Sequence, residues 1–328
     1  MLSEGRISMK KIKFLFGLMA SVTLMLMFVF IVNADEILEL QYESIVVDLG
    51  YKNEQIVYSV DFSDFITTVP SNLSLAELNF SSSDSSIAFA IENDYQGTVT
   101  IIGEDYGYTT INVSNDNFTE VIPVYVVYPR SGSEPDYDPI SWNFKAIREN
   151  RNCYSYALDI LEPVNELDAK GFNYFADPGD ITHAINNTTL DNPIDTYDEN
   201  LKKFLNYAKL DLLALNNTLI PNKTFKCLDL NNNYRVQFEE LLGIKDPNKF
   251  TVACDPGTYK VVLVRDDAGG MHWYRQDSNG LWSHKNGWDY ATNYGCDNKL
   301  IISPITTNES CAYGGYFYVG CFQVPVWR

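Results

Sequence analysis

One cysteine and two histidines have the residue types and the spacing of a nucleophilic site. Cys153 lies in residues 152–157, which have the pattern of a first helical turn, and Asn152 is placed to cap that turn. His272 and His284 follow far downstream, twelve residues apart. A helix start favours the thiolate form of a cysteine, and an imidazole can act as its base. The three residues therefore predict a cysteine nucleophile that is activated by histidine.

The two histidines lie on a predicted β-hairpin. Residues 272–275 and 281–284 have strand patterns, and Asn279-Gly280 between them is a strong hairpin signal. His272 and His284 then lie on neighbouring strands, where one imidazole can orient the other. Asn152 and the amide of Cys153 are the candidates for capping the helix and for an oxyanion hole.

Simpler interpretations of these residues stay open. The chain has six cysteines, and an even number in an exported protein favours full pairing, so Cys153 can be half of a disulfide. The histidines can lie on the surface of the hairpin, or they can bind a metal together with Asp277. If Cys153 is a thiol, the expected bridges join Cys311 to Cys321 and Cys227 to Cys254.

A second candidate site lies at residues 229–240, where oxygen-bearing side chains have the spacing of an EF-hand calcium loop. Its ligands would be Asp229, Asn231, Asn233 and Glu240. Tyr234 stands where the sharp turn of such a loop requires glycine. Apart from this possible calcium ion, the sequence predicts no cofactor.

Composition and the first residues predict a protein outside the cell. Three lysines precede an almost entirely apolar run over 14–32, and small residues follow up to Ala34, which predicts a signal peptide over 1–34. The net charge of −19 disfavours a nucleic-acid partner. A membrane partner is expected only if the apolar segment stays uncleaved, and the sequence does not predict an oligomeric state.

Hydrophobic periodicity divides the remaining chain into two units. Residues 35–130 contain short alternating strands separated by turn residues, which predicts an all-β sandwich. Residues 131–140 are polar and rich in breakers, which predicts a linker. Residues 141–328 mix helical patterns, at 153–161 and 201–215, with strand patterns, at 259–264 and in the hairpin. An insertion over about 160–255 separates the first helix from the first strand of this unit.

The first unit resembles bacterial immunoglobulin-like (Big) domains. Three segments carry the resemblance in the right order: residues 82–89, 97–99 and 107–113. The resemblance implies a spacer or an adhesive module, and no residue in it has a catalytic role.

The second unit resembles papain-like peptidases of the NlpC and CHAP type. The shared order is a cysteine at a helix start, Pro256-Gly257 before a strand, and then two histidines. The resemblance implies an α+β papain-like domain with an antiparallel sheet, in which Cys153 is the nucleophile, His272 the base and His284 the orienting residue. Asn152 and Tyr154 depart from the aspartate and serine that usually flank the cysteine in this family.

Two functions from different classes follow from these observations. The first is a secreted cysteine hydrolase, an amidase or endopeptidase that acts on peptides, including those of a cell wall. The alternative is a non-catalytic binding or adhesion protein of the cell surface. The position of Cys153 distinguishes the two, because only the hydrolase needs this thiol beside an imidazole.

Overall fold

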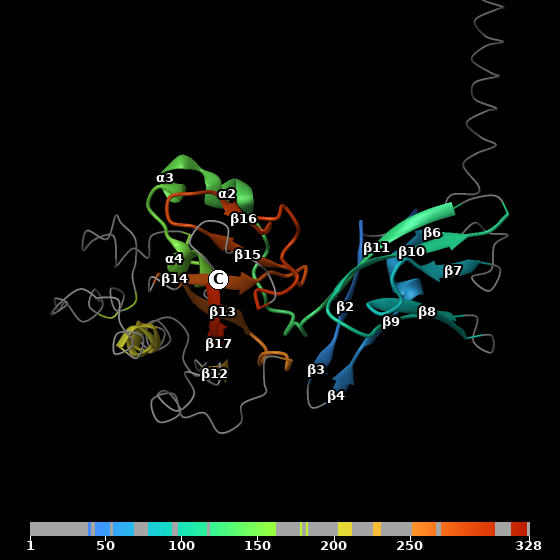
Figure 1. Cartoon of the computed structure of the whole chain (residues 1–328), viewed down its shortest axis with the longest axis horizontal. Coiled ribbons are helices and arrows are strands. Elements are labelled where there is room, and N and C mark those ends of the chain that lie inside the picture. The colour runs from blue at the N-terminus through green and yellow to red at the C-terminus, as the bar shows by residue number, and fades with distance from the viewer. Residues whose placement is uncertain are drawn as a thin grey trace, which may run out of the picture.

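The chain forms two β-rich units with few helices (Figure 1). The computed structural model describes residues 39–40, 43–52, 55–68, 78–93, 98–116, 119–161, 178, 182, 203–211, 226–230, 251–266, 270–305 and 316–326. None of the helices in these ranges is long and apolar enough to span a membrane. The expected signal peptide lies outside the described residues.

Two sheets enclose the core of the first unit. One sheet has the order β2 (Ile45–Asp48), β11 (Thr119–Val127), β10 (Gly107–Ser114) and β7 (Asn79–Ser82). The other has the order β5 (Ser59–Asp61), β9 (Thr98–Gly103) and β8 (Ala88–Asn93). Buried and less buried residues alternate along most of β9, β10 and β11, and the buried aliphatic residues, such as Val99, Ile111 and Val124, share one apolar core between the sheets. The alternating sequence pattern therefore predicts the inward face correctly.

Shorter elements complete the first unit. β1 (Glu39–Leu40) pairs with β6 (Ile66–Thr68), and β3 (Gly50–Lys52) pairs with β4 (Gln55–Val57). The 3-10 helix η1 (Phe62–Phe65) precedes β6 and places the buried Phe62 against Phe80, with ring centroids 5.2 Å apart.

An antiparallel sheet forms the centre of the second unit. Its order among the described strands is β12 (Lys226–Leu230), β17 (Tyr316–Pro325), β13 (Thr258–Asp266), β14 (Met271–Gln276), β15 (Trp282–Lys285) and β16 (Ala291–Thr292). Three short helices precede it in the chain: α2 (Pro139–Asn143), α3 (Lys145–Arg148) and α4 (Cys153–Ala157). Residues 203–211 are also helical, which confirms the helix expected at 201–215.

Helix α4 and the helical residues 203–211 cover one face of this sheet. Tyr154, Leu205 and Leu263 belong to the single apolar core that the helices and the sheet share. α4 is shorter than the helix expected at 153–161, because Asp159 has a φ of 54° and Ile160 N donates to the carbonyl of Ser155 at 3.0 Å. This is the usual termination of a helix by a left-handed residue.

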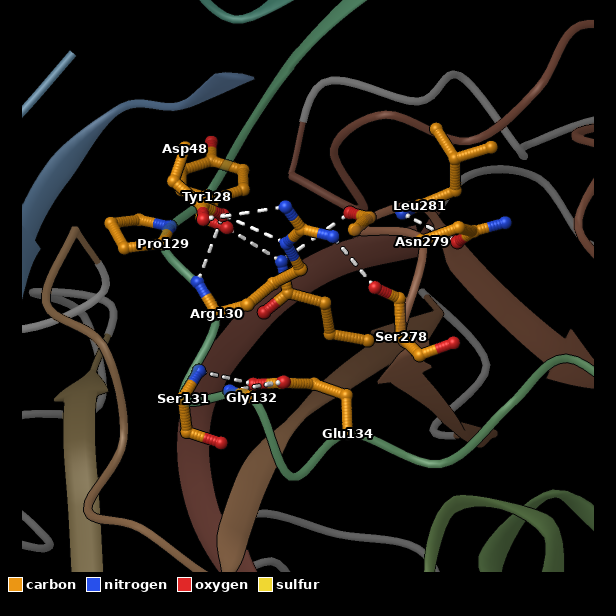
Figure 2. A network of polar contacts seen from close by, with 12 residues as sticks. Asp48, Tyr128, Pro129, Arg130, Ser131, Gly132, Glu134, Ser278, Asn279 and Leu281 are labelled. Carbon is orange, nitrogen blue, oxygen red and sulfur yellow. Dashed lines mark hydrogen bonds and ion pairs between the residues drawn. The ribbon is translucent and has the colours of Figure 1, made fainter. Parts of the chain in front are cut away.

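The expected linker and Arg130 just before it contact both units (Figure 2). We call residues 130–134 the strap. Arg130 Nε lies 2.9 Å from Asp48 Oδ1 of the first unit, and its Nη1 donates to the carbonyl of Ser278 of the second at 2.7 Å. Glu134 is buried and accepts hydrogen bonds from the amides of Ser131, at 2.6 Å, and Gly132, at 2.9 Å. The polar composition that predicted a linker therefore supplies the hydrogen bonds that fix this segment.

Aromatic and backbone contacts also join the two units. The ring of Tyr128, on which Tyr106 stacks at 4.0 Å, lies edge-on to Trp282 of the second unit at 6.4 Å, and the hydroxyl groups of Tyr128 and Ser303 lie 3.0 Å apart. Tyr51 exchanges backbone hydrogen bonds with residues 251 and 253, at 2.8 and 2.7 Å. The first unit is therefore packed directly on the second.

The hairpin between β14 and β15 reaches the same interface. Its turn is closed by hydrogen bonds from Asp277 N to Leu281 O, at 2.9 Å, and from Gly280 N to Asp277 O, at 2.8 Å, which confirms the expected hairpin. Gly280 has a φ of 83°, and a Cβ atom added there would lie 2.5 Å from Val127 Cγ2. Glycine is therefore needed both for the turn and for the approach to β11.

A Gly280→Ala substitution is expected to destabilise the protein by about 2–4 kcal/mol, because strain at positive φ adds to overpacking against Val127. Gly132→Ala is the matched control, because Gly132 has a φ of 88° and nothing lies within 4 Å of its added Cβ. The control should lose only about 1 kcal/mol. Chemical denaturation measures both, and equal losses would show that the contact with Val127 contributes nothing.

Candidate functional site

Cys153 is the first residue of α4, as the sequence predicts. The side chain of Asn152 caps the helix by accepting a hydrogen bond from Ser155 N at 3.0 Å. Cys153 is partly buried, is not in a disulfide, and packs beside the core that α4 shares with the sheet. The interpretation of Cys153 as half of a disulfide is therefore wrong.

The two histidines form a hydrogen-bonded pair. His272 Nε2 and His284 Nδ1 lie 2.8 Å apart, and the rings are nearly perpendicular, at 88°. His272 is buried, so the interpretation of both histidines as surface residues is wrong. The backbone of Tyr294 also forms a hydrogen bond with the ring of His284. Because this bond raises the pKa of His284, the backbone carbonyl is the acceptor and the ring is the donor. We therefore assign the shared proton to His272 Nε2, which donates to His284 Nδ1.

Burial keeps both imidazoles neutral. Burial, and then the neighbouring His284, hold the pKa of His272 well below its usual value. Burial also lowers the pKa of His284 to about 4, against a smaller opposing effect of the hydrogen bond to the backbone of Tyr294. Desolvation disfavours the charged form of an imidazole, and no carboxylate contributes to either shift. Near neutral pH the pair can accept a proton only at a cost to folding.

Cys153 and the imidazole pair lie on opposite faces of the sheet. Successive side chains of a strand alternate between faces. On β14, Trp273 and Arg275 face α4, with Arg275 Cζ 4.2 Å from the centroid of the Tyr156 ring. His272 and the next residue but one, Tyr274, face the other way, with their rings 4.9 Å apart. The structure brings the two imidazoles together and does not bring Cys153 to them.

The face that carries the imidazole pair is the face that meets the first unit. Tyr274 belongs to an apolar core that includes Tyr128 and the partly buried Tyr106. The hydrogen bond from Gln276 Nε2 to the carbonyl of Tyr128, at 2.7 Å, continues this contact along β14. The same strand thus carries the buried imidazole of His272 and the contacts of Tyr274 and Gln276 with the first unit.

A lysine that the sequence analysis missed lies on the same face as Cys153. The ammonium group of Lys285 donates to the carbonyls of Arg148, at 2.7 Å, Arg151, at 2.6 Å, and Gly287. Burial lowers the pKa of Lys285 to about 8, while the charge of Cys153 acts in the opposite direction. Lys285 thereby ties the segment before α4 to β15. Lys285 lies two residues after the buried Ser283, and the alternation of side chains along a strand places both on the same face. This alternation is the sequence signal that could have revealed it.

A second buried cation ties the other end of α4. Arg275 Nη1 lies 2.6 Å from Asp159 Oδ1, just after the helix, and its Nε lies 3.0 Å from Asp277 Oδ1. Arg275 and Asp277 are fully buried. Burial raises the pKa of Asp277 to about 6, although Arg275 opposes the shift. The pairing also separates Asp277 from the histidines, so the alternative of a metal site made by the three residues is wrong.

The calcium loop lies largely outside the described residues. Asp229 is in β12, where its backbone pairs with Cys321 of β17, whereas the first ligand of an EF-hand follows a helix. Asn231, Asn233 and Glu240 are not described. Within the described part of the chain, no three His, Cys, Asp or Glu side chains are grouped so that they could hold a metal ion. Calcium binding at this loop stays a prediction.

The expected disulfides are wrong. Cys254 and Cys321 both carry buried thiols, which excludes the bridges proposed to Cys227 and Cys311. Cys296 is disulfide-bonded, to a partner outside the described side chains. Burial raises the pKa of Cys254 to about 12, so its thiol is unreactive near neutral pH.

Several aromatic side chains of the second unit are exposed rather than in the core. Trp273 and Trp282 are buried, but Trp288 is 69% exposed and Tyr290 is 58% exposed. These two follow β15 in the chain, next to α3. The sequence pattern alone does not distinguish these exposed rings from the buried ones, because it does not show where β15 ends.

Comparisons with known proteins give distant likenesses. No family model matches the chain. The chain is 26% identical over 174 residues to Insoluble matrix shell protein 1 of Ruditapes philippinarum, which covers 53% of this chain and 80% of that protein. Two solved structures of the S-layer protein SbsC also match. Domains 5–6 are 19% identical with a TM-score of 0.21, and domains 4 and 5 are 20% identical with the same TM-score.

The S-layer matches are short. They cover 29% and 28% of this chain, and the chain spans about half the length of each S-layer chain, 47% and 51%. TM-scores this low do not assign a fold.

Proposed function

We propose that the chain is a non-catalytic binding or adhesion protein that acts outside the cell. The observation that carries this proposal is the separation of Cys153 from the imidazole pair by the sheet itself. A cysteine hydrolase of the expected type needs a base within hydrogen-bond reach of its thiol. Moving His272 to the face of Cys153 would require β14 to shift by one residue, which would turn Trp273 and Arg275 out of the core.

Three features support a location outside the cell. The first residues have the pattern of a signal peptide, and Cys296 is disulfide-bonded, which is typical of oxidising compartments. The shell protein that resembles this chain is named for an insoluble matrix. In this proposal the chain is likewise a structural or attaching component of an extracellular surface or matrix.

In the same proposal, the first unit is a bacterial immunoglobulin-like domain and the second unit has a papain-like α+β scaffold. The two packed sheets of the first unit and its alternating strands support the former. A helix start packed on an antiparallel sheet supports the latter. The contacts through Arg130 in the strap and through Tyr128 pack the two units directly together.

The second candidate function is the secreted cysteine hydrolase, an amidase or endopeptidase that could act on cell-wall peptides. It is favoured by the reduced thiol of Cys153 at a capped helix start with an ammonium group, Lys285, on the same face. In this candidate Lys285, rather than His272, is the charged neighbour of the thiol.

The Cys153→Ala variant separates the two functions. We expect the wild type and the variant to sediment equally with insoluble peptidoglycan, and neither to release free amino groups from it beyond the level without protein. An amine-reactive dye measures the release, and thermal unfolding checks that the variant folds. Release by the wild type that is lost in Cys153→Ala would establish the hydrolase and reject the binding proposal. His272→Gln then tests whether the histidine pair takes part.

A further inference from the structure

One end of the second unit exposes a group of large apolar side chains. Phe144, Trp288 and Tyr290 are 66%, 69% and 58% exposed, and Ile140 in α2 is 86% exposed. They belong to α2, the start of α3 and the loop between β15 and β16, which are grouped together in Figure 1. We call these four side chains the aromatic surface.

Hydrogen bonds hold the segments of the aromatic surface together. Asn143 Nδ2 donates to the carbonyl of Ala291 at 3.2 Å, and its Oδ1 accepts from the amide of Ala291 at 2.6 Å, which joins the end of α2 to β16. Lys285 joins the carbonyl of Arg148, at the end of α3, to that of Gly287. A hydrogen bond from Asp289 N to Asn286 O, at 2.8 Å, closes the turn that carries Trp288. The backbone segments that carry the rings are therefore held together before any ligand binds, which lowers the entropic cost of binding.

Polar groups border the exposed rings. Arg148 Cζ lies 4.5 Å from the centroid of the Tyr290 ring, so the guanidinium covers part of a ring that is still more than half exposed. Asp289 is exposed between the two aromatic residues, and Asn286 is partly exposed. Exposed rings with hydrogen-bonding groups of both kinds near them suit a ligand that has apolar faces and polar edges.

The area of the aromatic surface and the net charge of the chain narrow the class of ligand. The four side chains expose on the order of 500 Å² of apolar surface, estimated from typical side-chain areas. A stable protein–protein interface needs about 800 Å² from each partner, which argues against a second copy of this chain. The net charge of −19 disfavours a polyanion. A neutral glycan satisfies both conditions, because the C–H faces of its sugar rings stack on aromatic rings and its hydroxyl groups bond at their edges.

We propose that the aromatic surface binds a neutral polysaccharide, whose sugar rings stack on Trp288 and Tyr290. This inference rests on the proposed binding function and names its ligand class. Trp288 and Tyr290 are the stacking residues, Arg148 holds the Tyr290 ring, and Phe144 and Ile140 extend the apolar surface to a neighbouring sugar unit.

Tryptophan fluorescence of the full chain tests the proposal directly. Trp142, Trp273 and Trp282 are 2% exposed or less, so Trp288 is the solvent-exposed tryptophan of the described residues. With a β-1,4-linked glucose hexamer or N-acetylglucosamine hexamer as probe, we expect a blue shift of the emission and a loss of quenching by iodide. The two hexamers distinguish plain from N-acetylated glycans, and either result supports the proposal. Dextran sulfate, a polyanion, should give no shift.

Matched variants complete the test. Trp288→Ala and Tyr290→Ala should each weaken binding at least 10-fold by calorimetry, whereas Tyr58→Ala should not, because Tyr58 is 46% exposed on the first unit. Wild-type binding to neither hexamer, or equal binding by Trp288→Ala, overturns the proposal. A dimer that Trp288→Ala converts to a monomer, measured by sedimentation velocity, also overturns it. If the wild type then still sediments with insoluble peptidoglycan and releases no amines, the binding function stands and only the glycan assignment fails.

Discussion

An Arg275→Met variant is expected to lose about 3–5 kcal/mol of folding free energy, because removing one partner of a buried ion pair leaves the other charge buried and uncompensated. The carboxyl left behind is that of Asp277, which is fully buried and must either stay charged without its partner or bind a proton. Asp159 would also lose its ion pair with Arg275 at the left-handed position that ends α4. Urea denaturation at pH 7 measures the loss.

Two further variants identify the cause of that loss. Arg275→Met with Asp277→Asn should recover part of the stability, because the uncompensated charge is gone while the side-chain volume is kept. Arg130→Met is the control, because the Arg130–Asp48 pair is partly exposed at the interface and should contribute only about 1 kcal/mol. A loss below about 1 kcal/mol in Arg275→Met would show that the network around Asp277 does not hold the hairpin to α4.

Acid is expected to destabilise the wild type through the imidazole pair. The pKa of His284 is about 4 in the folded protein and 6.5 when unfolded, so between these values the unfolded chain binds a proton that the folded protein does not. The stability that His284 contributes is fully present above pH 6.5 and is lost as the pH falls towards 4. The loss from His284 is about 3 kcal/mol, and His272 adds to it in the same direction.

A non-titrating pair isolates this effect. In His272→Gln with His284→Asn, an amide donor and an amide oxygen replace Nε2 of His272 and Nδ1 of His284, so the hydrogen bond can remain while the titration is removed. Asp277 acts oppositely, because burial raises its pKa to about 6 and the folded protein gains stability as that carboxyl protonates. The informative quantity is therefore the difference between the two proteins in free energy of unfolding from pH 7 to pH 4. Parallel curves would contradict the prediction.

The local elements of this chain follow from its sequence. Alternating apolar residues predict β9, β10 and β11 and the face that each one buries. Asn279-Gly280 predicts the hairpin, because the turn needs a residue that tolerates positive φ. Asn152 predicts the start of α4, because its side chain replaces a hydrogen bond that the first turn lacks. Each of these inferences depends only on neighbours in the chain.

The candidate site follows from the sequence only in part. The spacing of His272 and His284 correctly predicts that the two rings meet, because residues on one face of a hairpin are cross-strand neighbours. Alternation also implies that Trp273 and Arg275 lie on the other face. What the alternation cannot reveal is which face receives α4 and which face receives the first unit.

Tertiary contacts determine which face of the sheet packs against α4 and which packs against the first unit. Arg275 and Lys285 have buried long-range partners around α4, and Tyr274 and Gln276 have theirs at Tyr128. Unmatched burial of either set would cost several kcal/mol, so these long-range pairings decide the docking of helix and sandwich. The partners lie more than a hundred residues apart in the chain. The alternation of residues along the sequence therefore determines the strands and the hairpin. The position of Cys153 relative to the imidazoles is determined by long-range contacts, which exist only once the whole chain has folded.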